Sequence, residues 1–178
     1  MSTQPVTDPL DPAFVHGLDQ LTLDELRRRR DVANERETQY SYVRRMVQGP
    51  LDILDAEVAR RTAGQPSGDV SDLVERLPSI LGDQIHAPGL GRLPAFLAPG
   101  AVDDALTRRL DAIVTTDELA DLASLDDARV AAIGAALRDF EREVSDTRRS
   151  LQEVVDQVKG ELIRRYRDGE APPEAPGT

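Results

Sequence analysis

The chain has 178 residues with a formal net charge of −11, 39% hydrophobic residues, 31% charged residues, no Cys and no Trp. The negative charge argues against direct binding to DNA, RNA or an anionic membrane, and the absence of Cys excludes disulfides and thiolate metal sites. The composition is typical of long amphipathic helices or a coiled coil, so we expect an all-α fold.

The sequence shows no signal for a membrane or a metal. No apolar run reaches the length of about 18 residues that spans a bilayer, and the first residues lack a signal-peptide pattern. We therefore expect a cytoplasmic protein. The two histidines, His16 and His86, lie in separate loop-like contexts, so we expect no metal site.

A first long helix is predicted over about residues 22–62. Residues 1–20 are rich in Pro, Asp and Thr, and we expect a flexible arm there. Thr22 followed by Glu25 has the spacing of a helix-initiating capping box. Pro50, which follows Gly49, removes one backbone hydrogen bond, so the helix either kinks at this point or breaks into two helices.

A second long helix is predicted over about residues 125–168, because Ser124 can initiate it and Gly169 can end it. The connection, residues 63–124, is expected to contain loops and short helices. The short helices are predicted over residues 70–83, 101–114 and 116–125, the last capped by Thr116 with Glu118 close by, and residues 84–100 are predicted to be a loop.

Two long helices separated by this connection predict an antiparallel coiled-coil hairpin. We expect one helical unit over residues 21–168, followed by a disordered tail over residues 169–178, which is rich in Pro.

The two predicted long helices contain an internal repeat. A shift of 104 residues brings nine identical residues into register between positions 37 and 61, and none of the nine is apolar. A helix duplicated only for packing would keep its apolar residues and let its polar face change, which is the reverse of this pattern. Five of the identities form the pattern Glu-x3-Ser-x2-Arg-x3-Gln-x3-Asp, present as Glu37, Ser41, Arg44, Gln48, Asp52 and as Glu141, Ser145, Arg148, Gln152, Asp156.

The repeated residues share one face of each helix. At about 100° per residue they fall within roughly 80° of one another, directly beside the apolar stripe. Two such helices packed antiparallel place their polar rows along the seam between them. The apolar stripe of the first helix consists of Tyr40, Val43, Val47, Leu51, Leu54 and Val58.

The residue types in this row can recognise guanine and phosphate. Arginine pairs with phosphate or with the N7 and O6 atoms of guanine, and aspartate can accept from guanine N–H groups. Serine and glutamine can satisfy phosphate oxygens or base edges. Taken singly, such residues are more often solvated helix surface, and their repetition is what favours a binding site.

The doubled motif resembles the signature of the RsiG family, actinobacterial anti-sigma factors that are controlled by cyclic di-GMP and hold the sporulation sigma factor WhiG inactive. The resemblance covers both long helices, and all ten motif positions match. It implies that the ten motif residues bind cyclic di-GMP as a dimer, that the partner is a sigma factor of the WhiG type, and that the protein regulates transcription. We expect no cofactor besides this regulatory ligand.

Within that resemblance, roles can be assigned by chemistry. We expect Arg44 and Arg148 to contact guanine or phosphate, the aspartates to accept from guanine, and the serines to donate to phosphate. The glutamates and glutamines are expected to orient the arginines or to read base edges. Arg45 and Arg149, at the border of the stripe, are candidates for extra phosphate contacts.

Two other functions remain as alternatives. A coiled-coil adaptor without a small ligand would depend on the apolar stripe and not on the motif. An enzyme has little support, since the sequence shows no nucleophile and base set, no metal cluster and no phosphate-binding loop.

Overall fold

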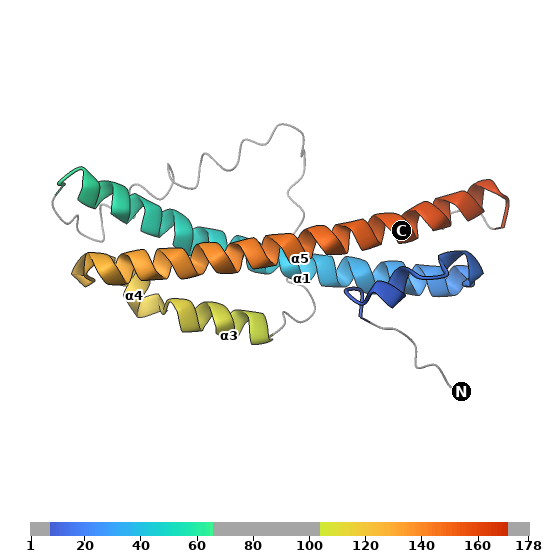
Figure 1. Ribbon diagram of the computed structural model, residues 1–178, viewed down its shortest axis with the longest axis horizontal. Helices are drawn as coiled ribbons and strands as arrows, with labels where there is room; N and C mark the ends of the chain where they lie inside the picture. Colours follow the sequence, from blue (N-terminus) through green and yellow to red (C-terminus); the bar gives the residue numbers. More distant parts are fainter. Residues whose placement is uncertain (1–7, 66–103, 171–178) are drawn as a thin grey trace, which may run out of the picture. The chain divides into compact units, whose positions relative to one another are not determined.

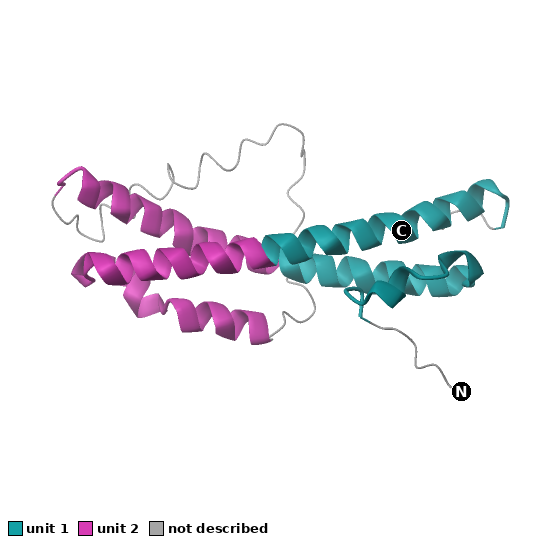
Figure 2. Ribbon diagram, viewed as in Figure 1, with its two compact units in different colours: residues 1–41, 144–178 teal, residues 42–143 magenta. Residues whose placement is uncertain are grey.

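The computed structural model describes residues 8–65 and 104–170, and all regular structure within them is helical. Two helices are long, α1 (Leu23–Thr62) and α5 (Asp127–Arg167) (Figure 1). The chain divides into two compact units, unit 1 (residues 1–41 and 144–178) and unit 2 (residues 42–143) (Figure 2). The all-α fold with two paired long helices is confirmed, whereas the single unit expected over residues 21–168 stays a prediction.

Unit 1 pairs the first part of α1 with the second part of α5. The two segments run antiparallel, because Arg27 lies beside Tyr166 while Glu37, further along α1, lies beside Arg148 on α5. Their apolar stripes meet in a core that excludes water, which is the main source of stability for helices of this kind. The core cluster contains Phe14, Leu26, Ala33, Val155, Val158 and Leu162.

The segment before α1 is part of the fold of unit 1. It forms two 3-10 turns, η1 (Pro12–Val15) and η2 (Leu18–Gln20). The sequence analysis expects a flexible arm over residues 1–20, but the described residues 8–20 pack against the long helices. The reason is Phe14, which is only 1% exposed, and Arg29, which donates a hydrogen bond to the Phe14 carbonyl and lies 5.3 Å from its ring.

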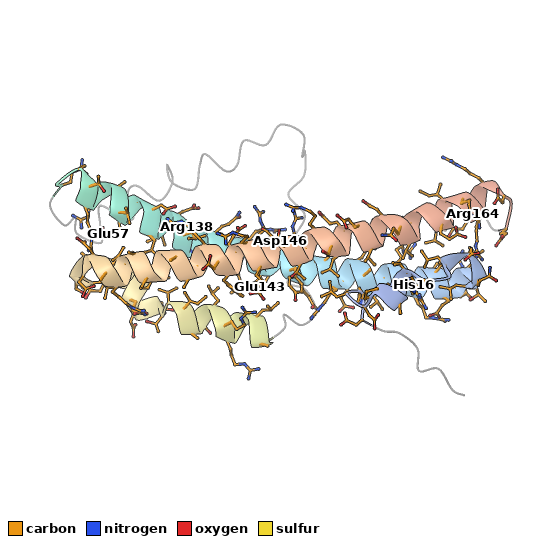
Figure 3. All side chains as sticks on the ribbon, in the orientation of Figure 1. His16, Glu57, Arg138, Glu143, Asp146 and Arg164 are labelled. Carbon is orange, nitrogen blue, oxygen red and sulfur yellow. The ribbon has the colours of Figure 1, made fainter. Side chains whose placement is uncertain are left out.

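Unit 2 pairs the second part of α1 with the first part of α5 and adds the short helices α3 (Asp104–Ile113) and α4 (Thr116–Ala120) and the 3-10 turn η3 (Leu122–Ser124). Helix α3 lies against α5, since Arg109 donates two hydrogen bonds of 2.7 Å to Glu143 and stacks 4.8 Å from the Phe140 ring. Charged side chains of α5 in this unit, Arg138 and Glu143 among them, project from the helix (Figure 3). The predicted short helices in the connection are confirmed for these residues.

Helix α1 continues without a break through Pro50. The alternative that the chain breaks into two helices at Gly49 and Pro50 is therefore wrong. A proline in a helix interior costs about 3 kcal/mol, and the burial of Val47 and Leu54 on either side, at 0% and 1% exposure, offsets that cost.

The helix ends largely follow the expected signals. Thr22 accepts a hydrogen bond from the Glu25 backbone N–H at 3.2 Å, and Gly169 ends α5 with a positive φ of 85°. Two caps differ from the prediction. Helix α4 is capped by Thr115 and not by Thr116, and Thr115 forms a full capping box with Glu118. Both are threonines, so the sequence pattern alone did not separate them.

The start of α5 differs as well. Asp126, and not Ser124, accepts from the backbone N–H of Arg129 at 2.7 Å, whereas Ser124 lies in η3 and donates to the Asp121 carbonyl.

Some predictions concern residues that the structure does not describe. The helix over residues 70–83, the loop over 84–100 and the tail from residue 171 onward lie outside the described residues. Among the described helices, none combines the length and apolar character needed to cross a bilayer.

Candidate functional site

The ten motif residues all lie on α1 and α5, and they divide between the two units. In each unit the glutamate of one motif copy lies with the arginine of the other copy. Unit 1 contains Glu37 and Ser41 from the first copy with Ser145, Arg148, Gln152 and Asp156 from the second. Unit 2 contains Arg44, Gln48 and Asp52 from the first copy with Glu141 from the second.

In unit 1 the centre of the cluster is the Glu37 carboxylate. Its Oε1 atom accepts hydrogen bonds from Ser41 Oγ at 2.8 Å, from Arg148 Nη1 at 3.3 Å and from Gln152 Nε2 at 3.3 Å. The side chains of Glu37 and Arg148 are 22% and 29% exposed. This carboxylate therefore links one residue of its own helix with two residues of the facing helix.

Arg148 keeps unused hydrogen-bonding capacity. Its Nε atom is buried and has no hydrogen-bond partner among the described residues. A buried donor without a partner costs about 1–3 kcal/mol, so an acceptor that reaches this nitrogen would recover that cost.

In unit 2 the equivalent pair is Arg44 and Glu141. Arg44 Nε donates to Glu141 Oε1 at 3.0 Å, and the two side chains are 36% and 25% exposed. The same relationship therefore occurs in both units: a glutamate from one helix holds the arginine of the other. In each pair the charged carboxylate restrains the guanidinium, so both arginines are held by contacts within the protein.

The two aspartates of the motif have different surroundings. Asp52 is half-buried, and burial raises the pKa of its carboxyl, with a further contribution from the nearby charge of Asp55. Asp156 is exposed. An aspartate held partly out of water is ready to accept hydrogen bonds, because a ligand donor relieves the desolvation of its charge.

The position of the motif row explains its intermediate burial. Val43 and Val47 on the adjacent stripe are 1% and 0% exposed, so the row beside them lies at the border of the packed seam. All motif residues except Asp156 are half-buried. Arg45 and Arg149 lie one step further out and are exposed, which makes them weaker candidates than the motif arginines.

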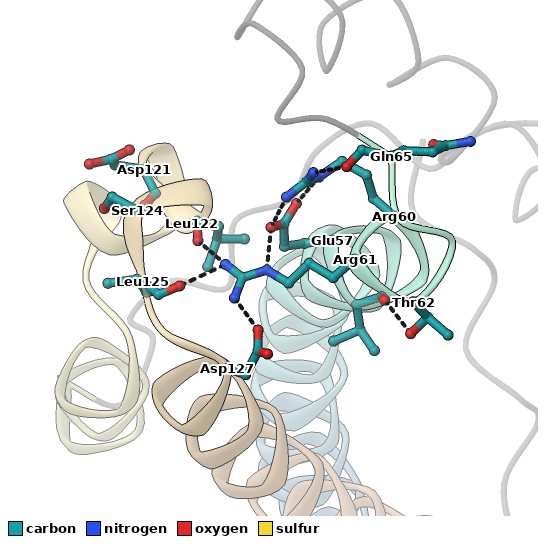
Figure 4. A network of polar contacts seen from close by, with 11 residues as sticks. Glu57, Arg60, Arg61, Thr62, Gln65, Asp121, Leu122, Ser124, Leu125 and Asp127 are labelled. Atoms are coloured by element: carbon teal, nitrogen blue, oxygen red, sulfur yellow. Dashed lines mark hydrogen bonds and ion pairs between the residues drawn. The ribbon is translucent and has the colours of Figure 1, made fainter.

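A second pair of equivalent arginines, Arg61 and Arg165, belongs to the nine identities of the repeat but not to the motif. In unit 2, Arg61 Nη2 donates to the carbonyls of Leu122 and Leu125 at 2.7 and 2.8 Å, in the turn before α5 (Figure 4). Its Nε donates to Glu57 and its Nη1 to Asp127, both at 2.6 Å. Arg61 thus connects the end of α1 with the start of α5.

Arg165 makes the same kind of contacts in unit 1. Its Nη2 donates to the carbonyls of Leu18 and Asp19 at 3.1 and 2.7 Å, in the turn before α1, and its Nε donates to Glu161 at 2.8 Å. The repeat therefore extends to the turns that precede the long helices. A sequence signal for this exists, since Leu18 and Leu122 are also 104 residues apart.

The carboxylates beside these arginines are stabilised in their charged form. Hydrogen bonds from Arg164 and Arg165 lower the pKa of Glu161 from 4.5 to about 2. The pKa of Glu57 is also lowered, chiefly by its hydrogen bond from Arg60. These pairs serve the helix ends and lie apart from the motif residues in the sequence.

Other kinds of site are not evident in the described part of the chain. No group of three or more His, Asp or Glu residues there could hold a metal ion. The chemistry concentrated on α1 and α5 is instead that of paired arginines and carboxylates beside an apolar seam, which suits a ligand rich in acceptors and planar groups.

Comparison with known proteins identifies the family of the chain. No curated protein matches the chain. A model of the RsiG-like family matches residues 12–81 and 116–177, which together make up most of the chain. The two matched segments begin 104 residues apart, the same shift that relates the two motif copies. The chain belongs to the RsiG-like family.

Proposed function

We propose that this protein is a cyclic di-GMP-binding anti-sigma factor, which sequesters a sigma factor of the WhiG type when the ligand is bound and so represses transcription of its targets. Membership of the RsiG-like family supports an anti-sigma role and favours a regulatory protein over an enzyme. The observation that carries the proposal is the pairing of the glutamate of one motif copy with the arginine of the other, found in both units.

The chemistry of the ligand matches these residues. Cyclic di-GMP presents guanine edges and phosphodiester oxygens, and an arginine fork can pair with either. The aspartates would accept from guanine N–H groups. The two motif copies carry the same residue types, so each copy can contact one half of a ligand dimer. We propose that cyclic di-GMP binds in this dimeric form.

The partner is expected to be basic where it meets this protein. A net charge of −11 suits an acidic protein that covers a DNA-binding surface, because such a surface must carry positive charge to bind phosphate. The ligand would strengthen the complex only as far as it binds the complex more tightly than the free proteins. Capture of the sigma factor is therefore expected to increase with the concentration of cyclic di-GMP.

The test is a calorimetric titration of cyclic di-GMP, with and without the sigma factor, into wild type and the variant Arg44→Ala/Arg148→Ala. Each bidentate arginine contact is worth about 1–3 kcal/mol, so the double variant should bind at least about 30-fold more weakly. The matched control is Arg45→Ala/Arg149→Ala, which removes the same charge from exposed neighbours. We expect it to retain most of the affinity.

Helicity measured by circular dichroism should be the same in all three proteins, because Arg44 and Arg148 lie at the border of the core and Arg45 and Arg149 are exposed. Unchanged ligand binding by the Arg44→Ala/Arg148→Ala variant would exclude the proposed site. If the sigma factor were captured equally well with and without nucleotide, the adaptor alternative would be favoured.

A further inference from the structure

Unit 2 contains a hollow of about 280 Å³ between the end of α1 and the start of α5. Val58 in its wall is 43% exposed, although the sequence analysis places this residue in the apolar stripe. Three residues of the wall, Arg61, Thr62 and Asp127, appear in Figure 4. The complete lining is Val58, Arg61 and Thr62 from α1 with Asp127, Val130 and Ala131 from α5.

The equivalent place in unit 1 is occupied. The residues 104 positions from Thr62 and Ala131 are Tyr166 and, on α1, Arg27. Tyr166 packs on the core cluster of unit 1. Arg27 donates from Nε to the Tyr166 hydroxyl at 3.3 Å, and its guanidinium carbon lies 5.9 Å from the centre of the ring. An aromatic ring with a cation beside it therefore covers this part of unit 1.

The hollow in unit 2 goes with a loss of covering side chains, because Thr62, Ala131 and Asp127 stand where unit 1 has Tyr166, Arg27 and Leu23. Threonine and alanine supply neither the ring nor the cation, so the apolar wall they leave is open. The effect is visible on the residue beneath: Leu162, the counterpart of Val58, is 3% exposed in unit 1, whereas Val58 is 43% exposed in unit 2. An apolar wall held open to water is a place where a partner gains by burying a side chain.

We propose that this hollow receives an aromatic side chain of a protein partner that carries an arginine or lysine beside the ring. The equivalent place in unit 1 shows that this framework accommodates a ring and a cation together. Asp127 at the rim accepts from Arg61 Nη1 at 2.6 Å, and its side chain is 89% exposed, so the same carboxylate can also accept from the partner's cation. Aromatic and arginine residues anchored in pockets are also the side chains that contribute most to protein interfaces.

This inference rests on the proposed function for the identity of the partner. Proteins that bind single-stranded nucleic acid combine basic grooves with aromatic side chains. A sigma factor that is sequestered through its nucleic-acid-binding surface would present that chemistry to the hollow.

The first test fills the hollow from within. The variant Thr62→Tyr/Ala131→Arg gives unit 2 the ring and the cation that unit 1 has. We expect it to melt at or above the wild-type temperature, to bind cyclic di-GMP normally, and to capture the sigma factor at least tenfold more weakly. The matched control is the reverse exchange in unit 1, Tyr166→Thr/Arg27→Ala, which should lower the melting temperature and leave capture within twofold of wild type.

A second variant tests the same hollow with a single substitution, in case the double variant does not fold. Val58→Lys places a charge at a position that is already exposed. It should also weaken capture at least tenfold, because the ammonium repels the partner's cation and removes part of the apolar wall on which the ring would pack. Capture of both variants at wild-type strength would overturn the inference and leave the proposed function standing. If wild type itself did not capture the sigma factor, both would be overturned.

The third test asks whether the hollow is open before the partner arrives. The chain has no Cys, so Thr62→Cys introduces a unique thiol at the rim. We expect it to react with a maleimide as fast as a thiol at the exposed position Ser150 in the free protein, and at least tenfold more slowly in the complex. Slow reaction in the free protein would mean that the hollow is already filled, and would overturn the inference.

Discussion

Arg61 and Arg165, which are 104 residues apart, make similar contacts in two different units. Each donates to a glutamate four residues earlier on its own helix and to two backbone carbonyls in the turn before the other long helix. Carbonyls that are partly shielded from water need donors, and a guanidinium can serve two of them at once. The start of each long helix is therefore held by the end of the other.

Loss of Arg165 should be costly for stability. Its side chain is only 8% exposed, and Arg165→Ala would leave the carbonyls of Leu18 and Asp19 without this donor. We expect a loss of about 2–3 kcal/mol in the free energy of unfolding, measured by urea denaturation. Arg164→Ala is the control: Arg164 also pairs with Glu161 but is 52% exposed, so its loss should cost less than about 1 kcal/mol. Equal losses would contradict this role.

Stability should fall in acid through Glu161. Its pKa is lowered from 4.5 to about 2 by its arginine partners, so the carboxylate contributes stability above pH 4.5, and this contribution disappears as the pH falls toward 2. We expect Glu161→Gln to have a lower melting temperature than wild type at pH 7. The difference in melting temperature should become smaller as the pH falls from 4.5 toward 2. Thermal unfolding followed by circular dichroism at a series of pH values measures it, and a constant difference would argue against an ionic contribution.

Phe14 should matter as much as a residue of the long helices. It is 1% exposed and belongs to the core cluster of unit 1. Phe14→Ala should cost about 3–5 kcal/mol of unfolding free energy, the usual range for a large buried aromatic. His16→Ala changes an exposed neighbour and should cost less than about 0.5 kcal/mol. A small effect of Phe14→Ala would favour the flexible arm that the sequence suggests.

Some parts of the fold follow from the sequence pattern and others do not. Hydrophobic periodicity and end signals predict both long helices to within about two residues. The pattern does not show that Glu37 pairs with Arg148 on the other helix, because that depends on how the two seams are aligned. The pattern also does not predict the burial of Phe14. A short segment rich in Pro and Asp has no helical periodicity, and its order depends on the packing of one ring against the long helices. Pro50 has the opposite effect on the prediction: it suggests a break in the helix, but tertiary packing keeps α1 continuous where local propensity would end it.

Asp52 should show a conflict between stability and binding. Its pKa is raised by burial and by the charge of Asp55, so the fold favours the neutral carboxyl. The neutral carboxyl therefore adds to the free energy of unfolding at low pH, and this stabilisation is lost as the pH rises through the raised pKa. Asp52→Asn should therefore melt about 1–3 °C higher than wild type at pH 7, with a smaller gain in acid. The amide replaces one acceptor oxygen with a donor, so cyclic di-GMP should bind at least about tenfold more weakly. Asp156→Asn, at an exposed position, should leave the melting temperature unchanged.

A stabilised Asp52→Asn variant that still binds cyclic di-GMP normally would remove Asp52 from the proposed site. The charge of this half-buried carboxylate would then contribute neither to the stability of the fold nor to nucleotide binding.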